Sequence, residues 1–145
     1  MGDLLGMYTY QLKHSIILLN ANLNGALEQM VCAHDIGHDK CHRHESKVTA
    51  FKEFMLFNMK SIMEYEANVF AAHIFLDNGE VMDLAKQGYD VCGMARATNT
   101  DAKIMLIKLQ EFSRLGFNLK VTQDPDSRFF RKIKASGIAN YDYTD

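Results

Sequence analysis

Four of the six histidines in this 145-residue chain lie within fourteen positions, in the stretch VCAHDIGHDKCHRH that covers residues 31 to 44. Two of them, His34 and His38, are four residues apart, so on a helix their imidazoles lie on one side and can reach a common point. Two imidazoles at this spacing suit a divalent cation, and Zn²⁺ binds histidine nitrogen at about 2.0 to 2.1 Å. The pattern therefore predicts Zn²⁺ first, while Mn²⁺ and Fe²⁺ also fit imidazole and carboxylate ligands.

Two histidines alone do not make a hydrolytic zinc site, which needs a third protein ligand and an open position for water. The candidates for the third ligand are Glu64 and Glu66 in the stretch EYEAN, on a second helical segment. A histidine pair is weak evidence by itself, because buried histidines are often only hydrogen-bonded core residues. The conjunction of the pair with downstream acids strengthens the metal-site hypothesis.

Small residues beside these candidates predict that the two helices lie close together. Ala33 and Gly37 form a flat patch on the first helix, and Ala67 and Ala71 form a matching patch on the second. A glycine inside a helix costs about 1 kcal/mol relative to alanine, so Gly37 implies a compensating role. A close approach that brings a glutamate to the ion would compensate for that cost.

The elements that must position these residues follow from the hydrophobic pattern. The runs GMYTYQ and SIILLN predict a β-hairpin near the amino terminus. Residues 24 to 42 and 62 to 76 have the periodicity of core-facing helices, with Asn24 and Ser61 as N-caps. Residues 45 to 60 are poorly periodic, and we interpret them as a connection over a sheet edge or as a further strand around EFMLF.

Three more helical segments are predicted toward the carboxyl end. They are EVMDLAKQG with a stop at Gly88, DVCGMARAT, and TDAKIMLIKLQEFSRLG with Thr100 as its cap and Gly116 as its stop. The last two segments resemble a helix-turn-helix, but we interpret them as helices that pack within the domain itself. Contact of Lys103 and Lys108 with phosphate is the alternative.

Composition narrows the class of protein. The three cysteines (Cys32, Cys41 and Cys92) are odd in number and show no paired spacing, which favours a reducing, cytoplasmic compartment. The longest aliphatic run is the four residues IILL, so neither a signal peptide nor a membrane span is expected. Residues 96 to 134 carry nine Lys and Arg against four Asp and Glu, an excess too small to predict direct nucleic-acid binding. Oligomeric state is not indicated.

The order of GMYTYQLKHSIILLNANL, VCAHDIGHDKCH and EYEANVFAAHIFL resembles the ImmA/IrrE family of metallo-endopeptidases. Members of that family typically show a hairpin, an AHELGH-like helix and an ExEANxFAAxLL-like helix. The resemblance runs from about Gly6 to Leu76 and implies a zincin-like domain in which His34 and His38 bind Zn²⁺. It also implies Glu64 as third ligand, with Glu66 as the alternative. Asn68, four residues after Glu64, would then orient a ligand histidine.

The chain departs from the family pattern at Asp35, where the usual motif has a glutamate that acts as general base. Aspartate is shorter by one methylene, and proton transfer requires about 2.6 to 3.2 Å between the heavy atoms. Asp35 is therefore the predicted general base. The point in question is whether its shorter side chain reaches the water. A second metal set from Cys41, His42 and His44 fits no closed zinc pattern, so we interpret His42 as the end of the helix, where a cation is favoured.

These observations predict a single α+β domain over residues 1 to 145, zincin-like, with a small twisted sheet packed on the histidine-bearing helix. The catalytic core spans about 6 to 76, a helical part about 79 to 116, and a peripheral tail 117 to 145. The resemblance implies zinc-dependent hydrolysis of an intracellular regulator, typically a helix-turn-helix repressor of a mobile element or prophage. The alternative is a non-hydrolytic metal-binding module that binds a repressor or DNA.

Overall fold

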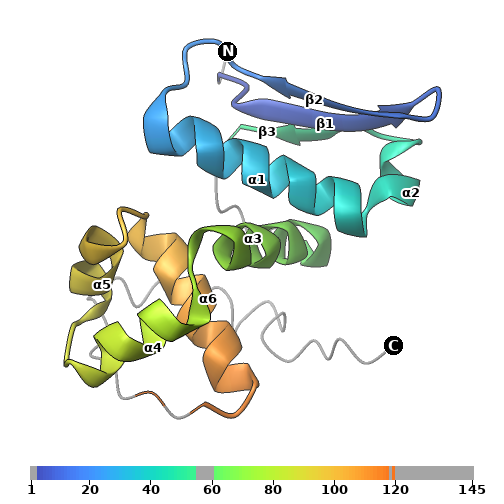
Figure 1. Ribbon diagram of the computed structural model, residues 1–145. Coiled ribbons are helices and arrows are strands. Elements are labelled where there is room, and N and C mark those ends of the chain that lie inside the picture. Colours follow the sequence, from blue (N-terminus) through green and yellow to red (C-terminus); the bar gives the residue numbers. More distant parts are fainter. Residues whose placement is uncertain (1–2, 55–60, 118, 120–145) are drawn as a thin grey trace. The chain divides into compact units, whose positions relative to one another are not determined.

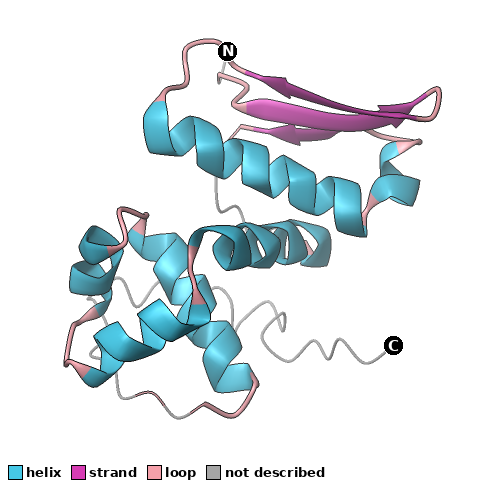
Figure 2. Cartoon of the chain, viewed as in Figure 1, coloured by secondary structure: helices cyan, strands magenta, loops and turns pink. Residues whose placement is uncertain are grey.

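The computed structural model describes residues 3–54, 61–117 and 119, and it has the predicted α+β class (Figure 1). Its described part contains one three-stranded antiparallel sheet and six helices (Figure 2). The chain divides into two compact units, with the boundary between Ile74 and Phe75. None of the described helices combines the length and the hydropathy of a membrane-spanning segment.

The sheet belongs to the first unit and has the strand order β2-β1-β3. The predicted hairpin is confirmed as β1 (Gly6–Gln11) and β2 (His14–Leu19), which pair in antiparallel register. Strand β3 (Phe51–Glu53) pairs with the other edge of β1. It ends where the predicted strand EFMLF begins, and residues 55 to 60 lie outside the described residues.

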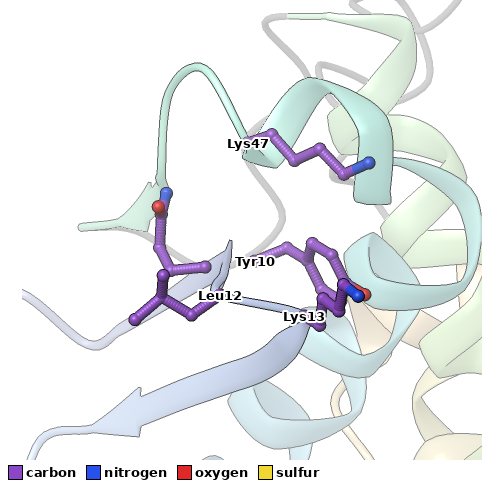
Figure 3. A pocket seen from close by; sticks show the side chains of 5 residues that line it. Tyr10, Leu12, Lys13 and Lys47 are labelled. Atoms are coloured by element: carbon purple, nitrogen blue, oxygen red, sulfur yellow. The ribbon is translucent and has the colours of Figure 1, made fainter.

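The hairpin turn consists of Leu12 and Lys13, whose φ values of 51° and 66° lie in the left-handed region. Two such residues give the twist that a two-residue hairpin turn requires, although asparagine and glycine are the usual occupants. Next to this turn lies a hollow of about 470 Å³, lined by Tyr10, Gln11, Leu12, Lys13 and Lys47 (Figure 3). Lys47 Nζ lies 5.5 Å from the centre of the Tyr10 ring. The two charged residues that line it among the described residues, Lys13 and Lys47, are both basic.

Helix α1 (Gly25–Cys41) runs along one face of the sheet and is followed by the single turn α2 (Arg43–Ser46) (Figure 1). Tyr8 of β1 is completely buried, and its hydroxyl donates a 2.7 Å hydrogen bond to Asp39 of α1. Ser15 and Arg43 also donate to this carboxylate. Burial alone would raise the pKa of Asp39, but these donors outweigh burial and lower it to about 2. Asp39 thereby fixes the hairpin against α1.

Helix α3 (Ile62–Phe75) matches the second predicted helix. Ser61 caps it as predicted, because its Oγ accepts a 3.2 Å hydrogen bond from the backbone N–H of Glu64. The buried face of α3 includes Tyr65, Ala67 and Asn68. The cap fixes the first turn of the helix, which is the turn that carries Glu64.

The second unit contains α4 (Asn78–Lys86), α5 (Val91–Ala97) and α6 (Ala102–Arg114), which confirm the three predicted segments as helices. Each begins after an aspartate whose carboxylate accepts a backbone N–H, namely Asp77, Asp90 and Asp101. The predicted cap at Thr100 is therefore wrong by one residue. The Thr100 hydroxyl instead pairs with that of Thr98 at 2.8 Å, and the carboxylate of Asp101 also suits the positive end of the helix dipole.

Lys108 of α6 is buried and lies over the ring of Phe112, with Nζ 5.4 Å from the ring centre. Burial lowers its pKa, and the charge of Asp77 partly opposes this effect. A side chain in this position does not reach a phosphate in solvent. The alternative role considered for Lys108 therefore finds no support in the second unit.

Candidate metal centre

The structure brings His34 and His38 of α1 together with Glu64 of α3. The two Nε2 atoms of the histidines lie 3.1 Å apart. Glu64 Oε2 lies 3.1 Å from His34 Nε2, and Glu64 Oε1 lies 3.2 Å from His38 Nε2. Ligand atoms around a tetrahedral Zn²⁺ at 2.0 to 2.1 Å would be about 3.3 Å apart, so these spacings fit such an ion.

The close approach of α1 and α3 depends on the small residues noted in the sequence. A Cβ atom added to Gly37 would lie 3.0 Å from both Cα and O of Ala67, and 3.1 Å from Cβ of Phe70. Backbone thus faces backbone at this crossing, and Glu64 on the preceding turn of α3 reaches the histidines. The close approach of the two helices that Gly37 predicted is therefore observed.

Hydrogen bonds on the far side of each imidazole occupy Nδ1, so Nε2 is the ring nitrogen that faces the centre. His34 Nδ1 lies 2.7 Å from Asn68 Oδ1, so the ring donates its Nδ1–H to the amide oxygen. His38 Nδ1 lies 3.0 Å from His42 Nδ1, and His42 Nε2 lies 3.1 Å from Glu66 Oε2. With His42 donating to Glu66, its Nδ1 accepts from His38. Such bonds orient ligand histidines and set their tautomer.

Glu66 therefore contacts His42, and it is not among the residues that meet at the centre. His42 ends α1, as its place in the sequence indicated, but it is also buried and supports His38. The ring of Phe51 stacks on His38, with 4.1 Å between ring centres and 13° between planes. The support for His38 thus comes from β3, α1 and α3 together.

A second glutamate, Glu53 of β3, lies at the centre and was not predicted from the sequence. Its Oε2 is 2.7 Å from His34 Nε2, and the residue is only 3% exposed. The ligand atoms of His34, His38, Glu53 and Glu64 all lie within 4.8 Å of one another. The available signal was an acidic residue inside the largely apolar stretch AFKEFMLF, but only the strand pairing shows where it points.

The electrostatics of this four-residue cluster favour a cation. Burial lowers the pKa of His34, but hydrogen bonds and charges from Glu53 and Glu64 outweigh burial and raise it to about 10. Burial raises the pKa of Glu64, yet both histidines hold it well below its usual value. Burial also lowers the pKa of His38, whereas it raises that of Glu53. Two carboxylates facing two imidazoles are a suitable donor set for a divalent ion.

Asp35, the predicted general base, is completely buried but is not a member of the cluster. Its Oδ2 lies 2.8 Å from the position that a Cβ on Gly6 of β1 would occupy. Among the described residues, neither carboxylate oxygen of Asp35 has a hydrogen-bond partner. Burial raises its pKa to about 7. Its carboxylate lies between α1 and the sheet, beside the first residue of β1.

Comparison with known proteins identifies the class of this fold and site. The sequence profile of Peptidase M78, the IrrE N-terminal-like domain family, matches residues 3–93. The chain belongs to this family. It is also 28% identical over 106 residues to "Uncharacterized immunity region protein 2" of Bacillus phage phi105, an alignment that covers 73% of this chain and 66% of that protein, just under two thirds of its length. No solved structure matches.

The Peptidase M78 match contains every residue of the cluster and of its hydrogen-bonded support. It covers the whole sheet, α1 and α3, and so includes all three elements that carry the four cluster residues. The family resemblance inferred from the hairpin and the two motif helices is therefore confirmed. Membership in a peptidase family makes these four residues, which could hold a metal ion, the candidate site of the domain.

Replacing His42 tests the support for His38 in this Peptidase M78 domain. We expect His42→Ala to weaken zinc binding by about 10- to 100-fold, because His38 loses the partner that fixes its ring and tautomer. The measurement is competition for Zn²⁺ against a chromophoric chelator. His44→Ala is the matched control, because it removes an exposed imidazole two residues away. Equal affinities for wild type and His42→Ala would contradict the supporting role.

Proposed function

We propose that this chain is a zinc-dependent endopeptidase whose metal ligands are His34, His38 and Glu64. The observation that carries the proposal is the convergence of these three side chains, from two helices, at the mutual spacing that a tetrahedral ion requires. Two imidazoles and one carboxylate are the protein ligands of several hydrolytic zinc sites, which keep the fourth position for water. A bound Zn²⁺ would act as a Lewis acid and would lower the pKa of that water toward 7.

The other residues of the site have supporting tasks. Asn68 holds the ring of His34, and the pair His42 and Glu66 holds the ring of His38. Two buried carboxylates are candidates for accepting the proton of the attacking water, namely Asp35, as the sequence predicts, and Glu53. Peptide hydrolysis needs one such group to take this proton and return it to the leaving amine.

The substrate we propose is a helix-turn-helix repressor of a prophage or mobile element, in the cytoplasm. Two findings support this choice: the resemblance to ImmA/IrrE proteins, and the similarity to a protein named for a phage immunity region. The chain itself is not proposed to bind nucleic acid. The repressor would be the partner, and the zinc site would cut one of its peptide bonds.

The test is incubation of the zinc-loaded chain with the repressor encoded beside it, followed by mass spectrometry of the intact products. We expect two repressor fragments whose masses sum to that of the repressor plus one water. Chelator should abolish cleavage, added zinc should restore it, and His38→Ala should be inactive. A repressor that stays intact with zinc-loaded protein, or is cleaved equally after chelation, would contradict the proposal.

One observation favours a second candidate, a non-hydrolytic metal-binding module that binds the repressor. Glu53 lies close enough to the cluster to serve as a fourth ligand, and four protein ligands would leave no position for water. Asp35, outside the cluster, would then have no catalytic task. This candidate predicts a stable, zinc-dependent complex with an intact repressor.

A further inference from the structure

The position of Glu53 is fixed by the sheet and not by the metal-site helices. Glu53 pairs with Gly6 in the antiparallel register of β3 and β1, and its carbonyl accepts a 2.6 Å hydrogen bond from the N–H of Leu5. The side chain therefore extends from a fixed backbone toward His34. A carboxylate held in this way is preorganised, which is the property required of a group that transfers protons.

The contact between Glu53 and His34 implies a change of partner when an ion binds. His34 Nδ1 already donates to Asn68, so Nε2 is the atom left for the ion. Glu53 Oε2 lies 2.7 Å from that same Nε2 and accepts a hydrogen bond from it. An ion at Nε2 removes this donor, and a buried carboxylate without a donor is costly. Water is the donor that a hydrolytic site provides.

Asp35 has a carboxylate, which can accept a proton, but it lies outside the cluster. Its carboxylate is wedged beside Gly6, and its oxygens are not among the ligand atoms that lie within 4.8 Å of one another. Glu53 is the only further carboxylate, beyond Glu64, that the described residues place in that cluster. The chain therefore has a shorter acid in the helix motif and a longer acid on the neighbouring strand.

We propose that Glu53 is the catalytic residue that accepts the proton of the attacking water, an inference that rests on the proposed peptidase function. As the water oxygen bonds to the scissile carbonyl carbon, one O–H bond of the water breaks and its proton passes to Glu53. Glu53 then gives this proton to the amide nitrogen as the C–N bond breaks. The products are a carboxylic acid and an amine, and no other reactant is needed.

The test uses cobalt-substituted protein and acetohydroxamate, a small chelator that also donates hydrogen bonds. Visible absorption of Co²⁺ reports both metal binding and binding of the probe, so no peptide substrate is needed. We expect Glu53→Gln to keep its cobalt affinity within about threefold of wild type. It should weaken acetohydroxamate by about tenfold or more, because a charged acceptor beside the probe is lost. Asp35→Asn should change either affinity by less than about threefold.

Other results would overturn the inference. A large loss of cobalt affinity in Glu53→Gln, with probe binding unchanged or stronger, would make Glu53 a fourth ligand. Weaker probe binding in Asp35→Asn alone would return the task to Asp35. Glu45→Gln, an exposed position in α2, controls for loss of one charge, and circular dichroism confirms that each variant is folded. Wild-type protein that binds no cobalt would instead reject the proposed function, and the role of Glu53 with it.

Discussion

Replacement of Glu64 by alanine is expected to lower zinc affinity by at least about 100-fold, which corresponds to about 2.7 kcal/mol of binding free energy. The reason is geometric, because one carboxylate lies within 3.2 Å of the Nε2 atoms of both histidines. Of the proposed ligands, its removal leaves only the two imidazoles, which do not complete a zinc site. Competition against a chromophoric chelator measures the loss.

The matched control for this variant is Glu66→Ala on the same helix. Glu66 contacts His42 and not the cluster, so its loss should reduce zinc affinity by less than the loss of Glu64. Thermal unfolding gives an independent measurement, because zinc at 100 times its Kd stabilises the folded protein by about 2.7 kcal/mol. Wild type should therefore melt at a higher temperature with zinc than without, and Glu64→Ala should show a much smaller increase at the same zinc concentration. A greater loss in Glu66→Ala would reverse the assignment of the third ligand.

Replacement of Gly37 by valine is expected to destabilise the first unit by about 3 kcal/mol and to weaken zinc binding. Helix propensity alone predicts a slight gain, because valine suits a helix better than glycine. The observed packing predicts the opposite sign, because even a Cβ would lie 3.0 Å from the backbone of Ala67. Backbone atoms cannot turn away as a flexible side chain can, so α1 and α3 must separate.

The unfolding of this variant by urea, followed by circular dichroism, should be compared with that of Ala26→Val. Ala26 is exposed on the same helix, so the control places a valine side chain where no packed neighbour opposes it. The control should cost only about 0.5 kcal/mol, from propensity. A Gly37→Val protein as stable as wild type, with unchanged zinc affinity, would show that the helices need not be this close.

The parts of the site that were predictable are those with a local signal. The i, i+4 spacing of His34 and His38 places both rings on one side of a helix whatever surrounds it, and the small residues at Gly37 and Ala67 indicated the partner helix. That pairing left Glu64 and Glu66 as candidates, and the family resemblance favoured Glu64. The fold class was predictable for the same reason, because each helix and the hairpin has its own periodicity.

The residues that were missed depend on contacts between distant parts of the chain. Glu53 lies in a strand of only three residues, and its direction is set by pairing with Gly6 of β1. No periodic pattern exists over three residues, so the sequence could not assign its side chain to the site. The support of His38 by His42 likewise depends on Glu66, which only the position of α3 brings near.

Helix α3 contacts three buried histidines, from positions 64, 66 and 68. Glu64 lies between His34 and His38, Glu66 holds His42, and Asn68 holds His34. A rigid shift of this helix along α1 would break all of these contacts in a single event. The geometry of the site therefore depends on the packing of α3 against α1. A site that keeps only one or two of these contacts is not expected. Metal binding should therefore be all-or-none with respect to the packing of α3 against α1.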